Sequence, residues 1–126
     1  MKVGFVDVAY WVLAGLLALT FLWAGGVKVA MPADRLGAMW PWTLDLPRPL
    51  VRLIGTLEVL GALGLILPRV TGIAEGLSVA AAIGLVITPL GGLVLHVRRG
   101  EASQVVPNIV LAALAAITAW LAAATL

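Results

Sequence analysis

Four apolar stretches, each long enough for a helix that crosses a lipid bilayer, occupy most of this 126-residue chain. They cover about residues 8–28, 50–67, 73–97 and 105–126. A bilayer-crossing helix needs about 17–25 apolar residues, and lipid leaves backbone groups no partner outside the segment itself. The sequence therefore predicts an all-α fold: an integral membrane antiparallel four-helix bundle, forming a single domain over residues 1–126.

The composition makes lipid the solvent for much of this surface. Hydrophobic residues make up 63% of the chain and charged residues 11%, whereas soluble domains carry about 25% charged residues. The formal net charge of +2 is too small and dispersed to favour nucleic acid as a partner. The absence of cysteine excludes disulfides, thiol catalysis and iron–sulfur ligation. With a single histidine, we expect no metal site and no independent redox centre.

The distribution of basic residues predicts the orientation. Four spans place both termini on one side, and the segments 29–49 and 98–104 on the other. The loop side carries six cations: Lys28, Arg35, Arg48, Arg52, Arg98 and Arg99. The terminal side carries Lys2 and Arg69, so the positive-inside rule puts both termini outside the cell membrane. A cleaved signal peptide over residues 1–30 is the competing interpretation, but its apolar run is long and ends in a lysine.

Each span also carries one rare polar residue near the loop side: Lys28, Glu58, His96 and Asn108. Polar groups are costly in hydrocarbon and usually face the interior of a bundle. Glu58 follows Arg52 by six residues, or about 9 Å along a helix, so the four lie at a similar depth. Lys28 is the natural counter-ion of Glu58. Such a pair fixes helix packing, binds a ligand, or does both.

The other candidate site residues each have two interpretations. His96 is either a site residue or an interfacial side chain beside the following arginines, and Asn108 is either a ligand contact or a bridge between helices. Arg52 either lines the mouth of the site or anchors the span. Trp40 and Trp42 lie in the proline-rich segment 29–49. They are either interfacial anchors or part of a lid over the polar residues.

Small residues form stripes that lead to these polar residues. The first span has Ala14, Ala18, Phe21, Gly25 and Lys28 at steps of three or four, the second has Gly55, Glu58, Ala62 and Leu65, and the fourth has Asn108, Ala112 and Ala116. In the third span every fourth residue is small from Gly72 to Gly92, and His96 follows. Small residues let membrane helices approach closely. We therefore expect Gly76, Ala80 and Gly84 to pack inside the bundle, and Gly84→Leu to hinder assembly.

Several of these landmarks resemble the DoxX-like family of small four-helix membrane proteins. The matching pieces are Phe21–Lys28, Gly55–Ala62, His96–Glu101 and Pro107–Asn108. The resemblance implies a membrane protein that is linked, in some relatives, to quinone-coupled sulfur oxidation or to membrane oxidoreductase complexes. Eukaryotic relatives are regarded as assembly factors for ion-channel receptors.

Together these observations predict a polar-ended pocket between the helices for a small hydrophobic ligand, with quinone as the candidate, in a membrane oxidoreductase complex. The expected ligand-binding residues are Lys28, Glu58, His96, Asn108, Trp40, Trp42 and Arg52, and no catalytic residue is assigned. The alternative is a non-catalytic membrane scaffold or assembly factor, in which the same residues lock the bundle. The expected partners are the lipid bilayer and either another protein or a second copy of the chain.

Overall fold

The computed structural model describes residues 4–126, and within this range all regular secondary structure is helical. Lys2, one of the two cations expected on the terminal side, lies outside the described residues. Four long helices are α1 (Phe5–Ala30), α3 (Arg48–Thr71), α4 (Gly76–Arg98) and α5 (Val105–Ala124). The short elements are α2 (Ala33–Met39) and the 3₁₀ helices η1 (Pro41–Asp45) and η2 (Ala102–Gln104).

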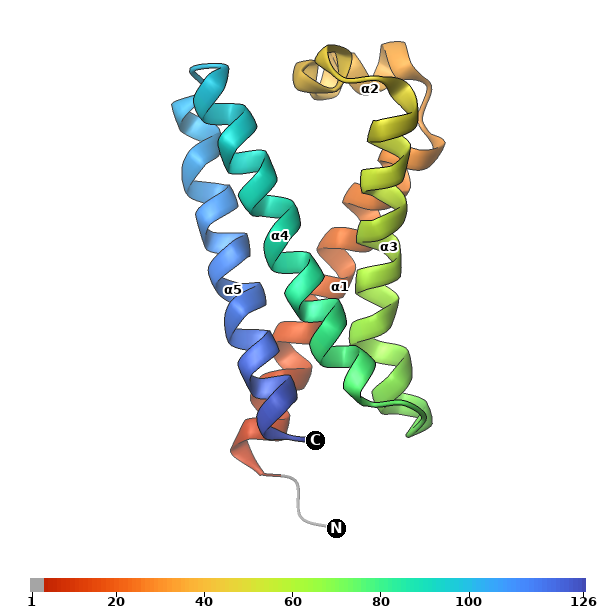
Figure 1. Cartoon of the computed structure of the whole chain (residues 1–126), viewed down its shortest axis with the longest axis vertical. Coiled ribbons are helices and arrows are strands. Elements are labelled where there is room, and N and C mark those ends of the chain that lie inside the picture. Colours follow the sequence, from red (N-terminus) through yellow and green to blue (C-terminus); the bar gives the residue numbers. More distant parts are fainter. Residues whose placement is uncertain (1–3) are drawn as a thin grey trace.

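The long helices form the predicted antiparallel bundle. Each packs on two neighbours: α1 and α4 both contact α3 and α5. α1 begins and α5 ends at one end of the bundle, while α2 and the turn between α4 and α5 lie at the other (Figure 1). All four have the length and hydropathy of membrane spans, and at most 28% of each span's most apolar window is buried. The apolar residues left on the outside need lipid as their solvent.

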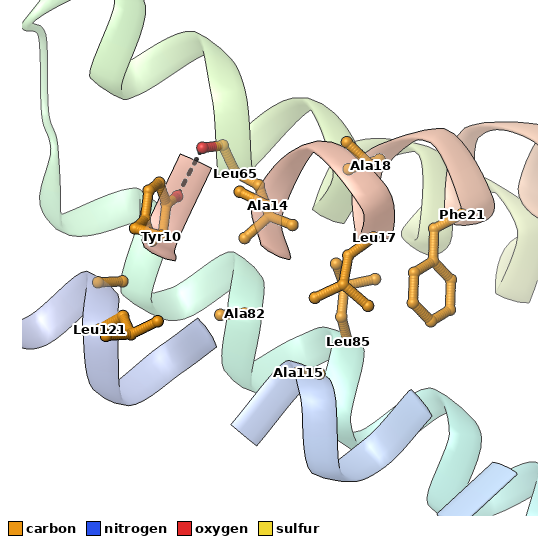
Figure 2. Close-up of a cluster of buried hydrophobic side chains, with 12 residues drawn as sticks. Tyr10, Ala14, Leu17, Ala18, Phe21, Leu65, Ala82, Leu85, Ala115 and Leu121 are labelled. Carbon is orange, nitrogen blue, oxygen red and sulfur yellow. Dashed lines mark hydrogen bonds between the residues drawn. The ribbon is translucent and has the colours of Figure 1, made fainter. Parts of the chain in front are cut away.

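The core is built from small and branched side chains. Tyr10, Ala14 and Leu17 of α1 pack with Leu65 of α3 and Leu85 of α4 (Figure 2). The Tyr10 hydroxyl donates a 2.6 Å hydrogen bond to the Leu65 carbonyl, so the core's one phenol is satisfied although it is fully buried.

The boundary between the second and third spans differs from the prediction. α3 continues past Pro68 to Thr71, and Gly72, with a φ of +71°, ends it in the left-handed region. α4 then begins at Gly76, three residues after the predicted start at residue 73. A proline inside a helix removes one hydrogen bond. Pro68 is buried against the bundle, and this packing keeps the helix intact through the defect.

The predicted inward stripe on α4 is wrong. Gly76, Ala80 and Gly84 are exposed, and a Cβ atom added at Gly84 would meet nothing within 4 Å. Each residue of an α-helix turns about 100°, so four residues turn about 400°, which is about 40° more than one full turn. Residues at a strict four-residue spacing therefore shift about 40° round the helix at each step. The stripe therefore winds from the lipid face to the bundle interior. The buried face instead follows steps of four, three, four and seven residues: Ser78, Ala82, Leu85, Pro89 and His96.

Candidate functional site

A buried ion pair joins α1 to α3 near the loop end of the bundle. Lys28 Nζ lies 2.6 Å from Glu58 Oε1, and the two residues are only 6% and 3% exposed. The helices come together one turn away through two glycines. A Cβ added at Gly25 would lie 2.5 Å from the Gly55 carbonyl oxygen, and one at Gly55 would lie 2.6 Å from that of Gly25. Backbone contact between glycines therefore holds the lysine and the carboxylate within hydrogen-bond reach.

Two tryptophans cover this pair, and both come from residues 31–47 between α1 and α3, which we call the connecting segment. Lys28 Nζ lies 4.9 Å from the ring centroid of Trp40 and 5.8 Å from that of Trp42. The two indoles are stacked, with an interplanar angle of 20° and 6.5 Å between centroids. A desolvated cation against indole faces is attracted by the ring quadrupoles. Both rings thus lie against the Lys28 ammonium group.

His96 continues the aromatic group on the opposite side of the bundle. Its ring meets that of Trp42 edge to face, with 6.4 Å between centroids. Nδ1 lies 2.8 Å from Glu101 Oε1, and His96 is 8% exposed. The side chain is therefore oriented by a carboxylate on one side and an indole on the other.

A chain of ion pairs then ties the connecting segment to the turn after α4. Glu101 Oε1 accepts a 3.0 Å hydrogen bond from Arg99 Nε, and Arg99 also pairs with Asp45 at the end of η1. The hydrogen bond with His96, and then the Arg99 guanidinium, hold the pKa of Glu101 below its ordinary value. We call the residues Asp45, Arg99 and Glu101 the latch.

Two predicted site residues lie apart from this group. Asn108 donates a 2.7 Å hydrogen bond to the Gln104 carbonyl and packs against α4 where Gly92 leaves room, since a Cβ added there would lie 2.7 Å from its Oδ1 atom. Arg52 is exposed on α3 and takes part in none of the ion pairs described above. The structure thus brings together Lys28, Glu58 and His96 with both tryptophans of the connecting segment.

Two hollows border α2, and neither is lined by the ion pair or by His96. One of about 200 Å³ lies under α2 and η1, with Thr43 and Arg48 among its lining residues. The other, of about 480 Å³, lies where α1 turns into α2. The indoles cover the ion pair directly. Over residues 4–126, no three residues of the types that bind metals lie close enough together to hold an ion.

Sequence reasoning did not find the latch. The pairing of Asp45 with Arg99 joins residues 54 positions apart, and it depends on how an irregular segment folds back. Glu101 lies in the His96–Glu101 piece of the resemblance, but no periodic pattern connects its side chain to His96.

A second polar group, at the opposite end of the bundle, was also not predicted. From the sequence, Arg69 is expected only to be a charge on the terminal side. Its guanidinium lies 4.2 Å from the Tyr10 ring centroid and donates to the Thr125 hydroxyl and the Ala122 carbonyl, both at 2.5 Å. These bonds fasten the end of α3 to the end of α5. The lone tyrosine inside an apolar run was the available signal for this contact.

Comparison with known proteins adds a family to this geometry. No curated protein and no solved structure matches the chain. The sequence profile described as the DoxX-like family matches residues 12–118, a range that contains Lys28, Glu58, His96 and both tryptophans of the connecting segment. Because this match covers most of the chain and the fold is a bundle of four spans, the protein belongs to the DoxX-like family.

Proposed function

We propose that this protein binds a small hydrophobic ligand at the Lys28–Glu58–His96 end of the bundle, as part of an oxidoreductase complex in the cell membrane. The ligand class is a flat ring that carries a carbonyl or hydroxyl group, and a quinone is the leading candidate. The excess of cations on the loop side supports an orientation with both termini outside.

One observation carries this proposal: a single buried ammonium group lies against both a carboxylate and two indole faces. A ligand carbonyl would accept a hydrogen bond from Lys28 or His96, and a ligand hydroxyl would donate to Glu58. The indoles of Trp40 and Trp42 offer flat apolar faces to a ring. The chain would supply hydrogen bonds and proton partners. Electrons would come from another subunit, so the proposal includes a protein partner that carries a redox centre.

The proposal also requires the connecting segment to move. Trp40 and Trp42 cover the Lys28 ammonium in this structure, so a ring that approaches Lys28 must displace an indole or slide between the two. The segment would act as a lid that opens for entry and closes over the bound ring. Arg52 and Asn108 remain predicted ligand-binding residues, at the mouth of the site and on the α5 side.

A non-catalytic scaffold or assembly factor is the second candidate. Two observations favour it: the ion pair satisfies itself within the bundle, and both hollows beside α2 lie away from it. In that role the polar residues would fix the packing of the helices, and a protein partner would bind the outside of the bundle.

Quinone binding by the purified protein separates the two functions. In lipid nanodiscs, a short-chain benzoquinone should quench tryptophan fluorescence saturably. Trp42→Ala should raise the Kd by about threefold to tenfold, because ring contacts of this kind contribute about 0.5–1.5 kcal/mol. Trp120→Ala, at an exposed position on α5, is the matched control and should leave the Kd unchanged. Quenching that never saturates, and is equal in all three proteins, would show partition into lipid and favour the scaffold.

A further inference from the structure

The groove of about 480 Å³ where α1 turns into α2 has a composition different from that of the site above. Leu22, Trp23, Gly26 and Ala30 line it along α1, and Arg35 lines it from α2. The groove therefore combines an apolar wall with one cation.

The apolar part of the groove follows the lipid-facing side of a membrane span. Leu22 and Trp23 are exposed, whereas Lys28 and Gly25 on the same helix face the bundle. Eight residues separate Leu22 from Ala30, which corresponds to about 12 Å along the helix. Gly26 has no side chain, and an added Cβ there would meet nothing within 4 Å. The groove is thus shallow and open, and it runs along a length of helix that suits part of an extended hydrocarbon chain.

The charged part lies at the boundary of the membrane. α1 ends at Ala30, and Arg35 follows in the next helix. Arg35 is exposed and forms no ion pair with any residue of the described range 4–126. Asp34 precedes Arg35 in sequence but does not line the groove. The guanidinium is therefore available to an anion from the headgroup layer, and Trp23 lines the same groove.

We propose that this groove binds one anionic phospholipid. An acyl chain lies against Leu22, Gly26 and Ala30, and the phosphate pairs with Arg35. Charge complementarity selects the headgroup: a choline or ethanolamine ammonium would add a second cation beside Arg35, whereas a glycerol headgroup leaves the phosphate charge uncompensated. Arginine is well suited to this contact because its planar fork matches phosphate oxygens.

Native mass spectrometry of the whole protein tests the proposal. The protein in detergent is mixed with phosphatidylglycerol or with phosphatidylcholine that has the same acyl chains. The detergent is then removed in the mass spectrometer, and the lipids that stay bound are counted for each variant. The wild type should retain one phosphatidylglycerol in preference to phosphatidylcholine. Arg35→Gln should reduce this preference by about fivefold, the effect of one interfacial cation. Arg98→Gln, an exposed cation on the same side that is outside the groove, should leave the preference unchanged.

A second pair of variants tests the acyl-chain wall without changing charge. Gly26→Leu fills the groove and should abolish retention of the lipid. Gly91→Leu adds the same side chain to α4, where an added Cβ also meets nothing within 4 Å, and should retain the lipid. Equal loss in Arg35→Gln and Arg98→Gln would overturn the site in favour of general surface charge. Unchanged retention in Gly26→Leu, or a changed oligomeric mass in that variant alone, would also overturn it.

Discussion

At the scale of single residues, the Lys28–Glu58 pair is the costliest feature of the chain. Burying two charges requires their desolvation, and the 2.6 Å contact offsets that cost only while both partners are present. The two indoles add a favourable environment for the ammonium group. The pair should therefore act as a unit, whether its role is ligand binding, helix packing or both.

We expect Glu58→Gln and Lys28→Met each to destabilise the protein more than the double change does. Each single change strands one buried charge at a cost of about 3–5 kcal/mol, whereas the double change removes both charges. Thermal unfolding in detergent measures the loss of stability in each of the three variants. Arg52→Met is the control: it removes an exposed cation from α3 and should change stability by less than about 0.5 kcal/mol. Additive effects of the two single changes would contradict the coupling.

The sequence predicts this pair better than it predicts the latch. Lys28 and Glu58 lie within apolar spans, where the length of the helix fixes depth and the cost of a charge limits its partners. Asp45 and Arg99 lie outside the spans, where water can solvate each charged side chain without the other. Only the path of the segment between α1 and α3 brings them together, and helical periodicity carries no information about that path.

At the scale of helices, the spacing of the small residues separates the correct predictions from the wrong one. The stripes at steps of three or four on α1 and α3 are buried as predicted, from Ala14 to Lys28 and from Gly55 to Leu65. The four-residue stripe on α4 is not, because a constant step of four drifts round the helix. The α4 stripe is therefore not a helix-packing seam, since a Cβ added at Gly76 or Gly84 would meet nothing within 4 Å.

We therefore expect opposite outcomes for two glycine-to-alanine changes. Gly55→Ala places a Cβ 2.6 Å from the Gly25 carbonyl oxygen and 2.7 Å from Lys28 Cβ, so α1 and α3 must separate at a cost of about 1–3 kcal/mol. Gly84→Ala points into open space and should be neutral or stabilising by up to about 1 kcal/mol, because alanine favours the helix. Thermal unfolding in detergent compares them. Equal destabilisation would mean that Gly84 also lies in a helix contact.

At the scale of the whole molecule, the bundle has a different fastening at each end. At the terminal end, Arg69 joins α3 to the end of α5 through hydrogen bonds to Thr125 and Ala122. At the loop end, the latch and the Trp42–His96 contact join the connecting segment to the turn after α4. Arg69 is bound to regular helices, whereas the latch holds an irregular segment, so opening should begin at the loop end.

We expect Arg99→Gln to increase local opening of residues 40–46 without unfolding the bundle. Partly exposed ion pairs contribute at most about 1 kcal/mol, so amide hydrogen exchange in that segment should accelerate by up to about fivefold, while exchange in α1 and α3 stays unchanged. Arg98→Gln is the matched control because Arg98 is the exposed neighbour outside the latch. If both variants exchange alike, the segment is held by its tryptophans and not by the latch.

Acid should release the same latch in the unmodified protein. The pKa of Glu101 is lowered by its hydrogen bond with His96 and by Arg99. Its contribution to the stability of the latch is therefore fully present above the ordinary glutamate pKa of about 4.3. That contribution is lost as the pH falls through the lower pKa of the folded state. Exchange of residues 40–46 should therefore accelerate, after correction for intrinsic rates, only below about pH 4.3. Glu101→Gln should abolish that acid step and already show the faster exchange at neutral pH. An acid step that persists in Glu101→Gln would assign the titration to another group, and the latch would then be held by Asp45 and Arg99 alone.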